Sequence, residues 1–144
     1  MEDILQLPAF GAQPFEGFAQ PYAIVTYFSD LDCQNCIHRE LKNLRVFSNA
    51  RRHELDFLLI VHDPIIAMGG KTSPYLSKMR RVAMVRYPIL LEPSRASCGL
   101  GHHFTIFLVD TATAEIQVTY QPDPNLSDWP FFEKRVAQIA GLKD

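Results

Sequence analysis

A chain of 144 residues, 47% of them apolar, has the length of one compact domain and enough apolar side chains for one core. Fourteen Lys and Arg face sixteen Asp and Glu without forming a basic stripe, which argues against nucleic-acid and membrane-surface partners. No apolar run approaches the ~20 residues of a membrane helix, and the first residues lack the basic start of a secretory signal. We therefore expect one soluble domain, 1–144, that is monomeric and cytoplasmic, or periplasmic if a signal or anchor has been trimmed.

The first part of the chain predicts an arm, a strand and a helix. Residues 1–21 are rich in Pro, Gly, Gln and Phe without a period, which indicates an irregular arm lying over a core of residues 22–142. Residues 22–28, YAIVTYF, form a short apolar run typical of a strand that is covered on both faces. From Cys36 onward the apolar residues recur with a helical period, at Ile37, Leu41, Leu44 and Phe47.

The second part predicts four more strands and two more helices. Residues 55–61, LDFLLIV, repeat the buried-strand pattern, and a basic helix should follow at 73–85, opened by Ser73-Pro74. Shorter apolar or alternating runs predict the strands at 88–91, 104–109 and 115–120. A last helix should begin near Ser127-Asp128, with Phe132, Val136 and Ile139 on its buried side and Trp129 as its anchor.

The order of these elements predicts the fold class. Helices follow the first two strands, and a hairpin precedes the last helix, which favours an α/β fold with a mixed central β-sheet flanked by helices in a three-layer α/β/α sandwich. The two cysteines of the sequence CQNC, Cys33 and Cys36, fall where the first strand passes into its helix.

This position gives the C-x-x-C pair a chemical meaning. A thiolate at a helix N-terminus faces unpaired N–H groups and the positive end of the helix dipole, and Cys33 gains most from both. The spacing allows Cys36 to close a reducible disulfide with Cys33. We therefore predict that Cys33 is the attacking thiolate and Cys36 the resolving thiol.

The pattern of a strand, F-x-x-x-x-C-x-x-C, a helix, FLLIV, YPILLEP and FLVD resembles the thioredoxin superfamily, and most closely its TlpA-like and AhpC/TSA-like thiol-disulfide oxidoreductases. The resemblance covers about residues 20 to 142. It implies a thioredoxin fold and exchange with a disulfide-bearing protein or small molecule. It also implies a dithiol protein as electron donor or acceptor, and no cofactor beyond the redox-active disulfide.

The chain departs from this family at three places. Asp32 stands where the family usually has Trp, and its negative charge should oppose thiolate formation at Cys33. Phe104 stands where the family has a cis-proline, so we expect a trans peptide there, with His103 and Phe104 as the substrate-binding residues. Gln34 and Asn35 separate the cysteines in place of the more common Gly-Pro.

Two alternatives to the exchange reaction remain open. Thiolates and imidazole suit copper(I) or zinc, so Cys33, Cys36 and His102 could form a metal site, and the His102 loop resembles that of Sco-type copper proteins. Cys98 could complete such a site or be a buried thiol without a role. The other alternative is a redox-inactive adaptor with the same fold. A peroxiredoxin is disfavoured, because no P-x-x-x-T-x-x-C pattern surrounds Cys33.

Overall fold

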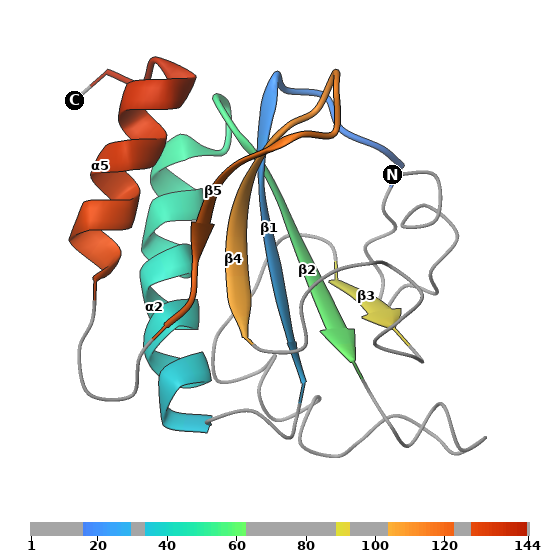
Figure 1. Ribbon diagram of the computed structural model, residues 1–144, viewed down its shortest axis with the longest axis vertical. Helices are drawn as coiled ribbons and strands as arrows, with labels where there is room; N and C mark the ends of the chain where they lie inside the picture. The colour runs from blue at the N-terminus through green and yellow to red at the C-terminus, as the bar shows by residue number, and fades with distance from the viewer. Residues whose placement is uncertain (1–15, 30–33, 63–88, 93–103, 123–127, 144) are drawn as a thin grey trace.

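The computed structural model describes residues 16–29, 34–62, 89–92, 104–122 and 128–143 (Figure 1). The elements in this part of the chain are β1 (Tyr22–Ser29), α2 (Gln34–Arg51), β2 (Asp56–His62), β3 (Ile89–Glu92), β4 (Thr105–Asp110), β5 (Ile116–Tyr120) and α5 (Trp129–Ala140). They confirm the predicted order of strands and helices, with boundaries that differ by one or two residues from those expected. The helix predicted at 73–85 lies outside the described residues.

The strands form one mixed sheet in the order β3-β2-β1-β4-β5. β1 pairs in parallel with β2 and antiparallel with β4, so Ile24 lies between Phe57 on one side and Leu108 on the other. β2 pairs in parallel with β3, and β4 pairs antiparallel with β5. β1 is therefore the central strand of the sheet, and β5 lies at an edge.

The two faces of the sheet carry separate apolar clusters, because side chains alternate between faces along each strand. One cluster joins the sheet to α2 and α5, which lie side by side on the same face (Figure 1), and it includes Ile24, Phe28 and Leu59. The opposite face carries Val25, Tyr27 and Leu58, among others, with Phe18 packed against them. Burial on both faces explains why β1 and β2 read as continuous apolar runs.

The helix α2 places its apolar stripe on the sheet. Ile37, Leu41 and Leu44 are fully buried, and Phe47 makes an edge-to-face contact with Trp129 of α5, with the ring centroids 5.8 Å apart. The helix ends at Arg51, whose carbonyl oxygen accepts hydrogen bonds from the N–H groups of Glu54 and Leu55. Among the described residues, no helix is long and apolar enough to cross a membrane.

The helix α5 begins where the sequence predicted, with Asp128 as the residue before its first turn. The Asp128 side chain makes no capping hydrogen bond, and its backbone carbonyl instead accepts from the N–H groups of Phe131 and Phe132, both at 3.1 Å. The helix ends at Gly141, whose φ of 69° lies in the left-handed region that glycine adopts without strain. Trp129, as predicted, is buried and anchors this helix to the core.

The residues before β1 are hydrogen-bonded to the start of β2 and to the residue that follows β4, at the same end of the sheet. Asp56, the first residue of β2, accepts hydrogen bonds at its Oδ2 from the N–H groups of Ala19 and Gln20, at 2.6 and 2.7 Å. Thr111, just after β4, donates its N–H to the Pro21 carbonyl and its hydroxyl to the Gln20 carbonyl. These bonds fix the chain as it enters the sheet.

Candidate functional site

Of the predicted active-site turn, the structure describes the part that belongs to the helix, from Gln34 onward. β1 ends at Ser29 and α2 begins at Gln34, which puts Cys36 in the first turn of the helix. Cys36 is 3% exposed and belongs to the same apolar cluster as Phe28 and Phe104. The thiol therefore lies at the helix N-terminus and within the core, as a resolving thiol would. Its predicted partner, Cys33, lies outside the described residues.

Phe104, one of the two predicted substrate-binding residues, is buried. It is 6% exposed, and its ring packs against Phe28 of β1 with the centroids 5.7 Å apart. His103 lies outside the described residues, as does the peptide bond that joins it to Phe104. The structure therefore places the Phe104 ring in the cluster that contains Cys36 and leaves its part in substrate binding as a prediction.

The alternative metal site falls mostly outside the part of the chain that the structure describes. Cys33, Cys98 and His102 are not described. Of the predicted metal ligands, the structure therefore places Cys36 alone, and the metal site stays a prediction. Within the described residues, no group of three His, Cys, Asp or Glu side chains could hold a metal ion.

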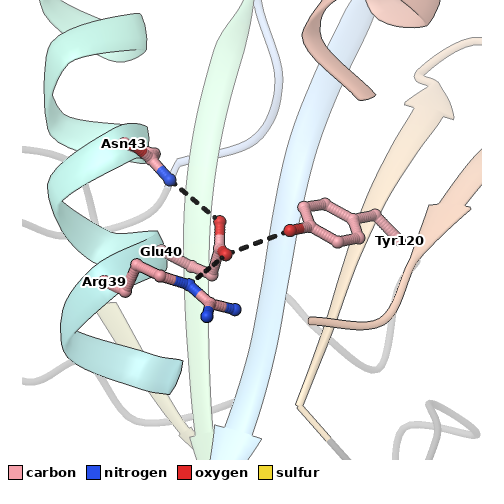
Figure 2. A network of polar contacts seen from close by, with 4 residues as sticks. All are labelled: Arg39, Glu40, Asn43 and Tyr120. Atoms are coloured by element: carbon pink, nitrogen blue, oxygen red, sulfur yellow. Dashed lines mark hydrogen bonds and ion pairs between the residues drawn. The ribbon is translucent and has the colours of Figure 1, made fainter. Parts of the chain in front are cut away.

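A buried carboxylate lies one helical turn after Cys36. Glu40 of α2 is 0% exposed, and Figure 2 shows three side chains directed at it. Its Oε1 accepts a hydrogen bond from Arg39 Nε at 2.9 Å and another from the Tyr120 hydroxyl at 3.0 Å. Its Oε2 accepts from Asn43 Nδ2 at 3.1 Å. We call these four residues the Glu40 network.

The network satisfies a group that would otherwise be costly to bury. A carboxylate removed from water loses several kcal/mol of hydration unless donors replace the water molecules. An ionised carboxylate is an acceptor only, and three donors on its two oxygens meet most of that need. Because Tyr120 comes from β5, the network also ties α2 to the edge of the sheet.

Arg39 is the positive member of this network. Its side chain is 31% exposed, against 0% for Glu40. Burial lowers the pKa of the guanidinium, but the hydrogen bond and negative charge of Glu40 outweigh it and hold the pKa above its usual value. Tyr120 and Cys36 add further electrostatic contributions in the same direction. Arg39 and Cys36 lie three residues apart in α2, a spacing at which side chains are neighbours on a helix surface.

Glu40 is not among the predicted site residues, although the sequence carries a signal for it. Glu40 lies three residues after Ile37 and four before Leu44, so it occupies a position in the apolar stripe of α2. A charged residue in such a stripe is buried only with partners. Arg39 and Asn43 are those partners, since both hydrogen-bond to Glu40.

Comparisons with known proteins point to the fold. No model of a protein family matches the chain, and no curated protein matches it. Among solved structures, a proposed thiol:disulfide interchange protein DsbE from Chlorobium tepidum superposes with a TM-score of 0.65 at 13% identity. That match covers 94% of this chain and 95% of the other.

Two further solved structures agree with this result. A thioredoxin-like protein in its oxidized form gives a TM-score of 0.62 at 11% identity, over 88% of this chain and 82% of the other. A thiol-disulfide isomerase from Corynebacterium glutamicum gives 0.57 at 13% identity, over 93% and 94%. At these identities the likeness concerns the fold, and it confirms the resemblance read from the sequence at that level. This chain has a thioredoxin-like fold.

Proposed function

We propose that the protein is a thiol-disulfide oxidoreductase in which Cys33 is the nucleophile and Cys36 the resolving thiol. The observation that carries the proposal is the position of Cys36, which is buried in the first turn of the helix that follows the central strand β1. The solved structures of similar fold include proteins described as thiol-disulfide interchange proteins and isomerases, which supports the same chemistry.

The proposed reaction moves two electrons from the dithiol to a partner disulfide. The Cys33 thiolate attacks one sulfur of the partner, the partner S–S bond breaks, and its second sulfur leaves as a thiolate that takes up a proton. The Cys36 thiolate then attacks Cys33 in the mixed disulfide. The bond from Cys33 to the partner breaks, the second partner thiol leaves, and Cys33 and Cys36 end as a disulfide.

The partners of this reaction follow from its chemistry. The substrate is a protein or small molecule that carries a disulfide, and a second dithiol protein returns electrons to the oxidised pair or, in the opposite direction, withdraws them. The electrons reside in the two cysteines, so the proposed step needs no bound cofactor. His103 and Phe104 are proposed to contact the substrate beside the cysteines.

Three single substitutions test the proposal on the full-length chain. We expect Cys33→Ser to abolish reduction of a disulfide-bridged test peptide, because the attacking sulfur is gone. We expect Cys36→Ser to accumulate a mixed disulfide between Cys33 and the peptide, detected as an added mass that dithiothreitol removes. Cys98→Ser is the matched control, because it removes a thiol outside the C-x-x-C pair and should leave the rate unchanged.

The pattern of the three rates decides the assignment. Equal peptide reduction by wild type, Cys33→Ser and Cys36→Ser would contradict the catalytic role of the pair. Loss of activity in Cys98→Ser with full activity in Cys36→Ser would move the resolving role to Cys98.

A further inference from the structure

The first turns of α2 bring a thiol, a cation and a carboxylate together. Arg39 and Glu40 follow Cys36 by three and four residues, and side chains at these spacings are neighbours on a helix surface, with about 5–6 Å between their Cβ atoms. Arg39 is the only arginine or lysine in the first two turns of α2. Its guanidinium is therefore the permanent positive charge nearest in the helix to the Cys36 thiol.

The Glu40 network holds this guanidinium in place. Neighbouring residues on a helix point about 100° apart around its axis. The Arg39 side chain therefore bends around the helix to bring its Nε within 2.9 Å of Glu40 Oε1. Glu40 itself is fixed from the sheet by the Tyr120 hydroxyl and from the next turn of α2 by Asn43 (Figure 2). A fixed cation stabilises a nearby anion more reliably than a solvated, mobile one, because it does not have to be ordered first.

We infer that Arg39 is a positioning residue for the exchange reaction: held by Glu40 and Tyr120, it stabilises the thiolate form of Cys36. The inference rests on the proposed function, in which Cys36 must lose its proton to solvent before it attacks Cys33. In the reverse direction Cys36 leaves as a thiolate, and the same charge favours its departure. Glu40 acts here by holding the guanidinium of Arg39, with which it shares a hydrogen bond, and not by accepting the proton of Cys36.

Within the part of the chain that the structure describes, few other charged groups lie near Cys36. Among the described residues, the titratable groups at this end of α2 are Glu40 and His38 on the helix and Tyr120 on β5. Glu40 is the one that opposes a Cys36 thiolate, and its charge is shared among three donors. In the cluster that contains Cys36, β1 contributes the apolar ring of Phe28, and Phe104, just before β4, contributes a second one. The helix N-terminus adds to the effect of Arg39.

The test follows the thiolate of Cys36 directly, in full-length protein with Cys33→Ser and Cys98→Ser so that Cys36 is the only thiol. The ultraviolet absorbance of the thiolate is recorded against pH. Adding Arg39→Gln should lower the thiolate population threefold to tenfold, about what the loss of one nearby opposite charge produces. Arg39→Lys keeps the charge and should recover most of the population. Arg45→Gln is the matched control, because Arg45 lies roughly two and a half turns from Cys36 along α2, and it should leave the thiolate population unchanged.

A second variant changes the charge in the opposite sense. Glu40→Gln keeps an oxygen that can accept from Arg39 but removes the negative charge, so the thiolate population should rise by about threefold. If Arg39→Gln fails to fold, Arg39→Met, which keeps the aliphatic part of the side chain and removes the charge, takes its place and should lower the thiolate population by the same factor. An unchanged or larger thiolate population in Arg39→Gln, or a smaller one in Glu40→Gln, would overturn the inference, as would an equal effect of Arg45→Gln.

Turnover is measured separately, in variants that retain all cysteines. We expect Arg39→Gln to slow the release of the mixed disulfide near neutral pH by the same threefold to tenfold, and Arg39→Lys to restore the rate. Absence of exchange in the wild type would contradict the proposed function, whatever the titration shows. Normal exchange in the wild type together with an unchanged Cys36 titration in Arg39→Gln would contradict the role of Arg39 alone.

Discussion

At the scale of single residues, the Tyr120 hydroxyl contributes to stability through its hydrogen bond to Glu40. It donates to a carboxylate that is 0% exposed, and a hydrogen bond to a buried charged group contributes more than one between neutral groups. Its ring also packs in the aromatic group of α5, with centroids 5.2 Å from Phe132 and 6.3 Å from Trp129. Removal of the hydroxyl alone separates these two contributions.

We expect Tyr120→Phe to lower the free energy of unfolding by about 2 kcal/mol, because one donor to buried Glu40 is lost and the ring stays. Urea denaturation of the wild type and the variant measures this difference. Tyr22→Phe is the matched control, because the structure gives the half-buried Tyr22 hydroxyl no hydrogen bond to the described residues. Its effect should stay within about 0.5 kcal/mol. A smaller loss for Tyr120→Phe than for Tyr22→Phe would contradict a stabilising Glu40 network.

The residue scale is also where the sequence was least informative. The C-x-x-C pair and its place before a helix could be read directly, because spacing and apolar period are local properties. The partnership of Glu40 with Tyr120 could not, because it joins residues that are eighty apart along the chain. It depends on which face of β5 meets α2, and that is set by the pairing of β4 with β5.

At the scale of elements, the strands that the structure describes were predicted to within one residue, because buried runs such as those of β1 and β2 have sharp polar limits. The arm before β1 was harder to predict, since nothing periodic shows where an irregular segment is fastened. Asp56 provides that attachment, as its carboxylate accepts two backbone N–H groups at short distances. Two such bonds resemble the capping of a helix, in which one side chain satisfies neighbouring N–H groups.

We expect Asp56→Ala to release the arm and to lower the free energy of unfolding by about 1–2 kcal/mol, since two charge-assisted hydrogen bonds are lost. Chymotrypsin cleavage after Phe18, which packs against the cluster on the far face of the sheet, should become faster. Asp128→Ala serves as the control, because the Asp128 side chain makes no capping bond. Unchanged cleavage after Phe18 in Asp56→Ala would show that the arm is held by other contacts.

At the scale of the whole molecule, the sheet separates two apolar clusters of described residues, and neighbouring residues of one strand belong to opposite clusters. Leu58 and Leu59 are neighbours on β2, both are 0% exposed, and they belong to opposite clusters. A single domain predicts that damage to either face destabilises both. The single tryptophan, Trp129, lies in the cluster that contains Leu59 and reports on that face.

We expect Leu58→Ala and Leu59→Ala each to lower the free energy of unfolding by about 2–5 kcal/mol, the usual cost of emptying a buried leucine site. Trp129 fluorescence and far-ultraviolet circular dichroism, followed in urea, should give one coincident transition in each variant. A shift of the circular dichroism transition without a shift of Trp129 fluorescence in Leu58→Ala would instead indicate two independently unfolding layers.

The edge position of β5 has one more consequence. Strands at a sheet edge are hydrogen-bonded along one side, and such elements open locally at a lower free energy than the centre of a sheet. Tyr120 is the last residue of β5, so each opening of this end would take one donor away from Glu40 and admit water to the buried carboxylate. The fraction of time that the end of β5 is paired would then set the fraction of time that Glu40 is shielded from water. The stabilisation of the Cys36 thiolate proposed for the first turn of α2 would thereby depend on local opening of the edge strand β5.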